Sequence, residues 1–217
     1  MITKALIAWG GWEGHGPEGC AVVVAEILKA RGVQCTVGQG TSAFVQHDLS
    51  DFQVIVPVFT MTDIEDHEVD AVCRAVRGGV GLAGFHGGMG DSFRTSIAWQ
   101  HMVGGQFVGH PRDFRDYRVD IRQPDHGICR GLGSFDLHSE QYYMQTDPRI
   151  NVLATTTFHE TGLSECDGVT IPNVWTTTYG RGRIFYSAFG HSPADFAHPQ
   201  IRNLFERGAL WAANKDL

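Results

Sequence analysis

Five of the eleven histidines lie in loops at or near the ends of predicted strands, where an open α/β fold gathers side chains from distant parts of the chain. A glutamate, Glu140, stands among them. Neutral imidazoles and a carboxylate are usual ligands of zinc or a similar divalent metal, often as three protein ligands with a position open for water. The same groups can act as acid and base near neutral pH without a metal. The five histidines are His15, His86, His110, His138 and His191.

The most distinctive of these histidines, His86, stands at the apex of Gly84-Phe85-His86-Gly87-Gly88, directly after an apolar run. This spacing of small residues is typical of a nucleophile elbow, where a strand turns sharply into a helix. Glycines are needed there because the turn strains the backbone and brings neighbouring strands close. We expect His86 to be a surface imidazole with little packing around it. A glycine-rich loop that merely contains a histidine is the alternative.

The positions of these residues suggest two sets of roles. Catalytic roles as acid or base are assigned to His86, Glu140 and His191. Metal ligation is assigned to His15, His110 and His138, with His86 and His191 as alternative ligands. His138 and Glu140 share a face if their strand continues through both residues, and this inference fails if the strand ends at Ser139. The other histidines are expected at the surface or the core edge: His47, His67, His101, His126, His159 and His198.

Two tryptophans and a glycine suit the binding of a small carbohydrate. Trp9 and Trp12 flank the first glycine-rich loop, and flat aromatic faces beside glycines suit a sugar ring. Trp9 is equally well explained as a core residue at the end of a strand. Gly87 and the glycines after it lead into a helix N-terminus, whose free N–H groups can receive an anion or oxyanion. The loop lacks the Gly-x-x-x-x-Gly-Lys-Ser/Thr pattern, so no nucleotide cofactor is expected.

The elements that must position these residues follow from hydrophobic periodicity. In the first half, strands at 4–9, 33–37, 51–58 and 80–85 alternate with helices at 18–31, 63–77 and 92–102, the last with Asp91 as its N-cap. This alternation predicts a parallel sheet with right-handed crossovers. In the second half, strands are predicted at 116–122, 134–143 with a turn at residue 139, 151–158, 173–179 and 183–189, before a closing helix at 198–213. We predict one domain over residues 1–217, with a mostly parallel central sheet, helices on both faces and an antiparallel extension.

Composition excludes several classes of partner. The chain has 217 residues, of which 42% are hydrophobic, and that is enough for a sizeable core. Its net charge of -7 and lack of a basic patch argue against nucleic-acid and anionic-membrane partners. Five scattered cysteines without a Cys-x-x-Cys pair predict neither disulfides nor a thiolate zinc site. Without a membrane-spanning run or a recognisable leader, a cytoplasmic location is expected. An antiparallel edge would allow two copies to pair as a homo-oligomer.

An ordered set of motifs resembles the trehalose-utilisation (ThuA-like) family nearly from end to end. The motifs are Gly84–Gly87, Phe93-Arg94, Val103–Pro111, Glu140 with Tyr142 or Tyr143, Val174-Trp175, Gly180–Tyr186, Gly190-His191 and Arg207–Trp211. The resemblance implies a flavodoxin-like fold of the class I glutamine amidotransferase type, a role in sugar catabolism, and Tyr142 as a substrate contact. Amidotransferases carry cysteine at the elbow where this chain has His86, so glutaminase activity is not expected.

Three hypotheses about function remain open. The first is an enzyme that acts on a sugar, an oxidised (keto) sugar or a glycoside, by hydrolysis or by proton transfer next to a carbonyl, with or without a bound divalent metal. Such an enzyme would be a hydrolase or of isomerase or lyase type. The second is a non-catalytic sugar-binding or regulatory module, which the missing elbow cysteine favours. The third, a cysteine-dependent hydrolase, is the weakest because none of the five cysteines lies at an elbow.

Overall fold

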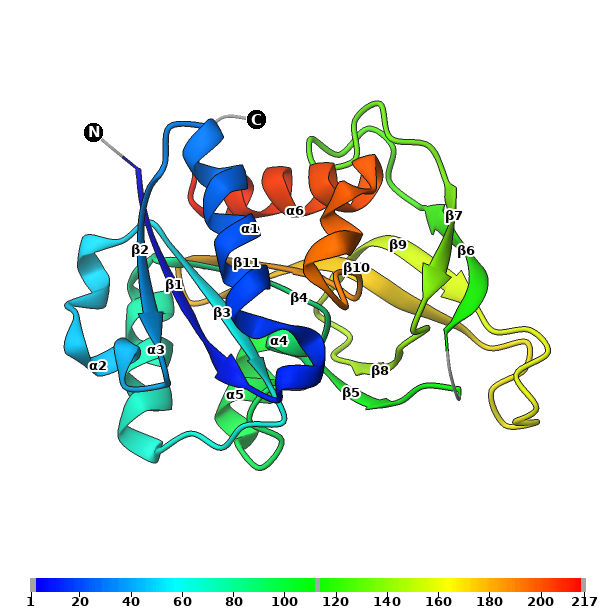
Figure 1. Ribbon diagram of the computed structural model, residues 1–217, viewed down its shortest axis with the longest axis horizontal. Coiled ribbons are helices and arrows are strands. Elements are labelled where there is room, and N and C mark those ends of the chain that lie inside the picture. Colours follow the sequence, from blue (N-terminus) through cyan, green and yellow to red (C-terminus); the bar gives the residue numbers. More distant parts are fainter. Residues whose placement is uncertain (1–2, 112–113, 216–217) are drawn as a thin grey trace.

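The computed structural model describes residues 3–111 and 114–215 and confirms the predicted α/β class (Figure 1). Its main sheet has nine strands in the order β2-β1-β3-β4-β11-β10-β9-β6-β7. The strands β2, β1, β3, β4 and β11 run parallel, and β10, β9, β6 and β7 form the antiparallel extension. Their bounds are β1 Lys4–Gly11, β2 Gln34–Gln39, β3 Val54–Thr60, β4 Gly81–Phe85, β6 Arg115–Ile121, β7 Phe135–Ser139, β9 Asn151–Thr157, β10 Thr170–Tyr179 and β11 Gly182–Ser187.

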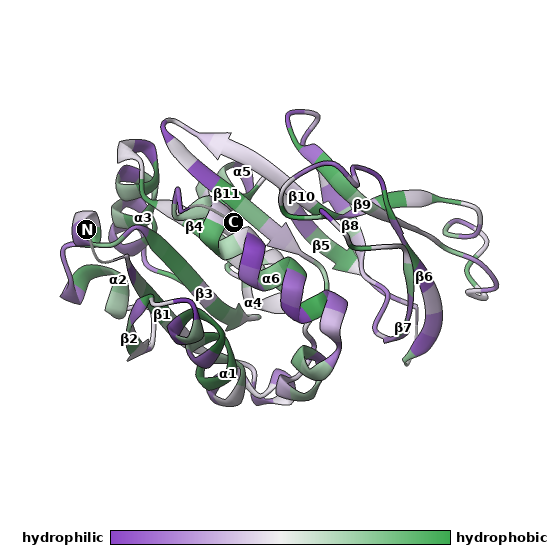
Figure 2. Ribbon diagram, turned by 90° about the horizontal axis from the view of Figure 1, so that it is seen from above, coloured by the Kyte–Doolittle hydropathy of each residue, from purple (hydrophilic) through white to green (hydrophobic). Residues whose placement is uncertain are grey.

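Helices cover both faces of the sheet. One hydrophobic core joins α1 (Pro17–Ala30) and α6 (Pro199–Ala212) to one face of the sheet. A second core joins α2 (Ala43–Gln46), α3 (Asp66–Gly78) and α5 (Ile97–Val103) to the opposite face. Because β3 and β4 lie between these layers, every residue of both strands is buried. Figure 2 shows β1 and β3 as largely hydrophobic, as expected of strands buried on both faces.

The predicted first residue of the helix at 92–102 is wrong. The chain turns into the short helix α4 (His86–Gly90) at the elbow itself, and α5 begins only at Ile97. Asp91 therefore follows α4 and is no N-cap; its buried carboxylate accepts hydrogen bonds of 2.6 and 2.8 Å from Arg94. The cap of α5 is Ser96, whose Oγ accepts a hydrogen bond from the Trp99 amide.

A small second sheet lies beside the main one. It pairs β5 (Gly105–Gly109) with β8 (Tyr143–Thr146) in antiparallel orientation. The predicted strand at 134–143 is thus divided: β7 ends at Ser139, the predicted turn, and β8 begins four residues later. The condition for His138 and Glu140 to share a face is not met. No helix within residues 3–111 or 114–215 is both long enough and apolar enough to cross a bilayer.

Candidate metal centre

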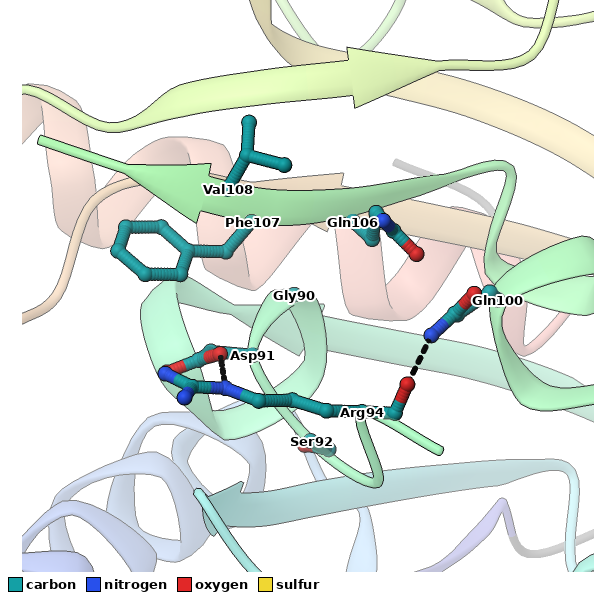
Figure 3. A pocket seen from close by; sticks show the side chains of 8 residues that line it. All are labelled: Gly90, Asp91, Ser92, Arg94, Gln100, Gln106, Phe107 and Val108. Atoms are coloured by element: carbon teal, nitrogen blue, oxygen red, sulfur yellow. Dashed lines mark hydrogen bonds and ion pairs between the residues drawn. The ribbon is translucent and has the colours of Figure 1, made fainter. Parts of the chain in front are cut away.

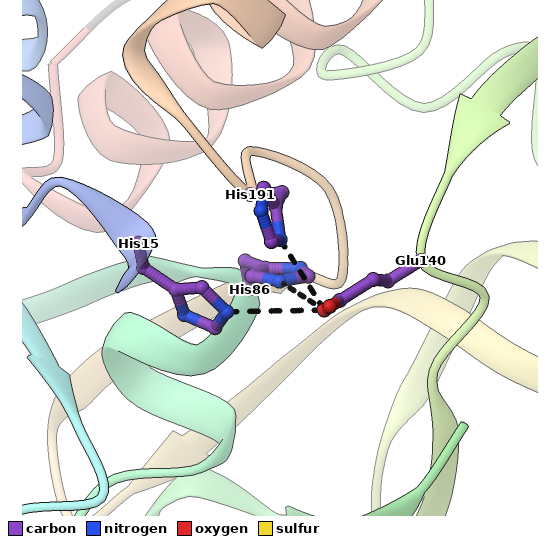
Figure 4. Close-up of side chains that lie close together, drawn as sticks. All are labelled: His15, His86, Glu140 and His191. Atoms are coloured by element: carbon purple, nitrogen blue, oxygen red, sulfur yellow. Dashed lines mark hydrogen bonds and ion pairs between the residues drawn. The ribbon is translucent and has the colours of Figure 1, made fainter. Parts of the chain in front are cut away.

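Four side chains from four separate segments meet at the carboxyl edge of the parallel strands (Figure 4). His15 ends a 3-10 helix after β1, His86 begins α4 after β4, His191 follows β11, and Glu140 follows β7. One nitrogen or oxygen atom from each lies within 4.8 Å of the others, so the four residues form a candidate metal cluster. The sequence predicts convergence of His86, His110, Glu140 and His191. The structure brings His86, Glu140 and His191 into the cluster, with the ring centroids of the two histidines 5.3 Å apart, and leaves His110 at its border.

His86 is held tightly inside the protein. Its backbone has φ of +45°, which is the strained conformation expected at an elbow apex. The residue is 1% exposed, and its ring stacks on the ring of Tyr142 at 4.0 Å between centroids. Its Nδ1 lies 3.0 Å from the carbonyl oxygen of Ala188, and its Nε2 lies 3.2 Å from Glu140 Oε2. The expectation of a surface imidazole with little packing is therefore wrong.

The hydrogen bonds around the cluster leave its nitrogens facing one carboxylate. Because only a protonated Nδ1 can donate to the Ala188 carbonyl, Nε2 of a neutral His86 is an acceptor pointing at another acceptor, Glu140. His15 has its Nδ1 3.0 Å from Thr60 Oγ1 and its Nε2 3.8 Å from Glu140 Oε2. Either a proton or a cation must lie between such groups. Protein metal sites commonly fix their ligating imidazoles through the second ring nitrogen in this way.

The third imidazole of the cluster has an orphaned nitrogen. His191 Nδ1 is buried and lies 3.3 Å from Glu140 Oε2, but it makes no hydrogen bond of acceptable geometry within the described chain. Its backbone N–H is anchored by the Asp195 carboxylate at 2.9 Å. A buried polar atom without a partner is costly, and a metal ion is one group that would satisfy it. The donor set of three imidazoles and one carboxylate fits zinc or a similar transition metal.

The other two histidines that we expected among the ligands are placed differently. His110 Nε2 lies 3.7 Å from Glu140 Oε1, the carboxylate oxygen turned away from His86 and His191, and its Nδ1 lies 2.7 Å from the carbonyl oxygen of Pro111. His110 thus borders the cluster without belonging to it. His138 lies outside it: its side chain is 62% exposed and pairs with Asp116 at 2.8 Å. The reason is that β7 alternates, so His138 points to solvent.

Two exposed aromatic rings flank the cluster. Trp12 packs against His15, and Phe114 packs against His191, each at 4.8 Å between ring centroids. Both rings are 48% exposed, so each leaves an open surface beside the ligands. Sequence reasoning singled out Trp12 but missed Phe114, because a lone aromatic residue in a polar stretch carries no periodic signal.

The remaining predicted substrate contacts have structural explanations. Trp9 is partly buried and packs against the core, as the alternative interpretation expected. Tyr142 is 3% exposed, and its ring stacks against the His86 ring. A side chain at Gly87 would place its Cβ 2.9 Å from His15 Nδ1 and 2.7 Å from Thr60 Oγ1. Gly87 is therefore required for the close approach of His15 to the elbow.

The electrostatics of the cluster favour an ionised Glu140 beside a neutral His15. Burial opposes ionisation of Glu140, but the nearby His191 and His86 outweigh it and hold the pKa of the carboxyl well below its ordinary value. Burial, and then the charges of His86 and His191, lower the pKa of His15 to about 3. Both states are those that a metal ion needs in its ligands.

We expect the metal-free protein to lose stability in acid. His15 has a folded-state pKa of about 3 against 6.5 normally, so the unfolded chain gains its proton first and stability falls as pH drops below 6.5. Glu140 adds a further loss below its ordinary value of 4.5, because its folded pKa is also lowered. Urea unfolding in the presence of a chelator, repeated across this pH range, measures the effect. The His15→Asn variant should show a flatter dependence between 6.5 and 4.5; an unchanged slope would contradict the assignment to His15.

A polar cavity of about 270 Å³ lies along β5, at the C-terminal end of α4 (Figure 3). Its wall carries the Asp91–Arg94 ion pair and the ring of Phe107. Phe107 contacts Tyr142 at 4.3 Å between centroids, and Tyr142 stacks on His86. Packed aromatic rings thus connect the wall of this cavity with the metal cluster.

The five cysteines do not form a nucleophilic site at the elbow. Cys20, Cys73 and Cys129 are buried, and Cys35 and Cys166 are partly buried. Burial raises the pKa of Cys20 to about 12 and that of Cys129 to about 11, which keeps both thiols protonated at neutral pH.

Comparison with known proteins identifies relatives of this chain. The sequence model of the ThuA family, described as trehalose utilisation, matches residues 4–212. A search among curated proteins finds no match. A ThuA-like protein from Parabacteroides merdae superposes with a TM-score of 0.82 at 21% identity, over 99% of this chain and 91% of that one. A ThuA-like protein from Bacteroides uniformis gives 0.80 at 20% identity, over 99% and 93%.

A more distant structure has the same fold. It is described as a cytoplasmic protein from Salmonella typhimurium and superposes with a TM-score of 0.64 at 14% identity, over 98% of each chain. At these identities the three structures show the fold, while the family match covers nearly the whole chain.

Proposed function

This chain belongs to the ThuA family of trehalose utilisation, and from that premise we propose that it is a sugar-catabolism enzyme with a divalent metal bound by His15, His86, Glu140 and His191. The observation that carries the proposal is the meeting of three imidazoles at one carboxylate, where His191 Nδ1 lies 3.3 Å from Glu140 Oε2 and makes no hydrogen bond of acceptable geometry within residues 3–111 and 114–215. A divalent cation bound among these imidazoles and the carboxylate would use their lone pairs, including Nε2 of a neutral His86, which otherwise faces the carboxylate as an acceptor.

The chemistry proposed for this site is hydrolysis or proton transfer next to a carbonyl of a sugar, a keto sugar or a glycoside. A divalent metal, when bound, supplies Lewis acidity toward a carbonyl or an activated water. His110 is the group best placed to move a proton: its Nδ1 donates to the Pro111 carbonyl, which leaves Nε2 available beside Glu140 Oε1. Trp12 and Phe114 offer flat surfaces for a sugar ring on either side of the ligands.

A metal-free version of the same enzyme is the nearest rival. In it, His86 carries a second proton, donates it to Glu140 across 3.2 Å and works with it as an acid–base pair. A non-catalytic sugar-binding module is the second candidate, favoured by an elbow that presents an imidazole in place of a thiol or hydroxyl. We also propose a cytoplasmic location, which the Salmonella structure's description supports.

Metal analysis of the purified protein, paired with a sugar panel, tests the proposal. We expect about one divalent metal ion per chain, turnover of at least one sugar, keto sugar or glycoside, and loss of turnover after chelation that returns when metal is restored. Turnover that survives complete metal removal would favour the acid–base rival. Sugar binding without turnover by the metal-loaded protein would favour the binding module.

A further inference from the structure

An apolar pocket opens directly beside the metal cluster. It has a volume of about 310 Å³, within the size range of small-molecule sites. One wall comes from the end of β5 and another from β8, and a third comes from the loop between β9 and β10. Its lining is mostly apolar, with Glu165 and His110 as its acidic and basic members; the other lining side chains are Val108, Pro111, Tyr143, Leu163 and Cys166.

His110 joins this pocket to the cluster. The same imidazole lines the pocket and lies 3.7 Å from Glu140 Oε1. A molecule whose reacting group reaches Glu140 would therefore extend past His110 into the pocket. His110 is thus the lining residue that also contacts the cluster, and it places the pocket next to the proposed active site.

The lining chemistry indicates what that part of the substrate is. Val108 and Leu163 are 47% and 40% exposed, and both line the same pocket. Exposed apolar side chains grouped in this way are typical of a binding surface. Apart from Glu165, His110 and Tyr143, the lining side chains offer sugar hydroxyls no strong hydrogen-bond partner, whereas an aromatic or alkyl group would be desolvated favourably against them.

The pocket is preformed. Thr161 in the β9–β10 loop donates from its amide and hydroxyl to Asp167 at 2.8 and 2.7 Å, which fixes the turn that carries Leu163 and Cys166. On the opposite wall, Tyr143 packs on the buried ring of Phe158 at 5.5 Å between centroids. An apolar group can enter without first ordering the walls, which favours binding.

We infer that this pocket is an aglycone subsite, and that the substrate is a glycoside whose sugar carries an aromatic or alkyl group. The inference rests on the proposed function, which places the sugar part of the substrate at the metal cluster. It narrows the substrate class from carbohydrates in general to glycosides of apolar alcohols.

Binding of matched glucosides tests the inference. Phenyl and methyl glucopyranosides, each as the α and the β anomer, are titrated into the purified protein by calorimetry. We expect at least one phenyl anomer to bind about tenfold more tightly than its methyl counterpart. Leu163→Ser removes an apolar wall and Cys166→Trp fills the pocket, so both should abolish the phenyl preference and leave methyl glucoside binding unchanged.

Val45→Ser is the matched control, because Val45 is equally exposed but lies on α2, away from this pocket. The inference is overturned if wild-type protein shows no phenyl preference, if no glucoside binds, or if the preference survives in both pocket variants. Because this experiment measures binding, it can fail independently of the proposed enzyme activity. A phenyl preference without turnover supports the aglycone subsite and counts against the proposed enzyme. Turnover of sugars without a phenyl preference supports the proposed enzyme and counts against the subsite.

Discussion

If the proposed metal enzyme is right, replacing His86 with asparagine should remove metal binding and lower turnover by at least about a hundredfold. His86 Nε2 lies 3.2 Å from Glu140 Oε2 at the centre of the cluster, and asparagine cannot place an imidazole nitrogen there. Asparagine is the appropriate replacement because it tolerates the positive φ of +45° better than most residues do. We expect a moderate loss of stability, about 1–3 kcal/mol, because the buried ring stacks on Tyr142.

His138→Asn is the control for this experiment. His138 has the same side chain, but it lies in solvent on β7 and pairs with Asp116. Metal content, turnover and thermal stability are measured for both variants. If His86 acts only as a general base, metal content should stay constant while the pH–rate profile loses one ionisation. Full metal content and full turnover in His86→Asn would remove His86 from the site altogether.

The gathering of the three histidines of the cluster could be predicted from topology. Parallel strands deliver their carboxyl ends to one edge of a sheet, so His15, His86 and His191 were expected at the same edge once β1, β4 and β11 were recognised. Glu140 follows the antiparallel strand β7, and its approach to this edge does not follow from the parallel strands. What these residues bind could not be read from the same pattern. The tautomer imposed on His86 by the Ala188 carbonyl depends on a contact between residues 102 positions apart, and the setting of His191 Nδ1 depends on Glu140, which is also far away in the sequence.

The errors of prediction arise where local signals are weak or a register matters. His138 was misplaced because side chains alternate along β7, which turns His138 to solvent, and because the strand ends at Ser139, so Glu140 does not continue the same face. The start of α4 was missed because its five residues include three glycines, which have poor helix propensity. Packing against β3 and β4 stabilises that turn despite its sequence.

The elbow glycines should dominate the stability of this region. A Cβ at Gly84 would lie 2.4 Å from Met89 Cβ and 2.5 Å from Met89 Sδ, inside contact distance. Met89 is 1% exposed and belongs to α4, the helix that begins with His86. Gly84→Val should therefore cost about 3 kcal/mol of unfolding free energy and also weaken metal binding, because it displaces the helix that presents the ligand.

Gly88 and Gly133 provide a graded comparison for this prediction. A Cβ at Gly88 would lie 3.2 Å from Val58 Cα, a tight but smaller conflict, whereas one at Gly133 would meet nothing within 4 Å. Urea unfolding of the three valine variants should rank the losses as Gly84 above Gly88 above Gly133, with Gly133→Val within about 0.5 kcal/mol of wild type. Equal stability of all three would mean that the elbow relaxes around an added side chain. The close approach of β4 and α4 would then not be the cause of the strained φ of His86.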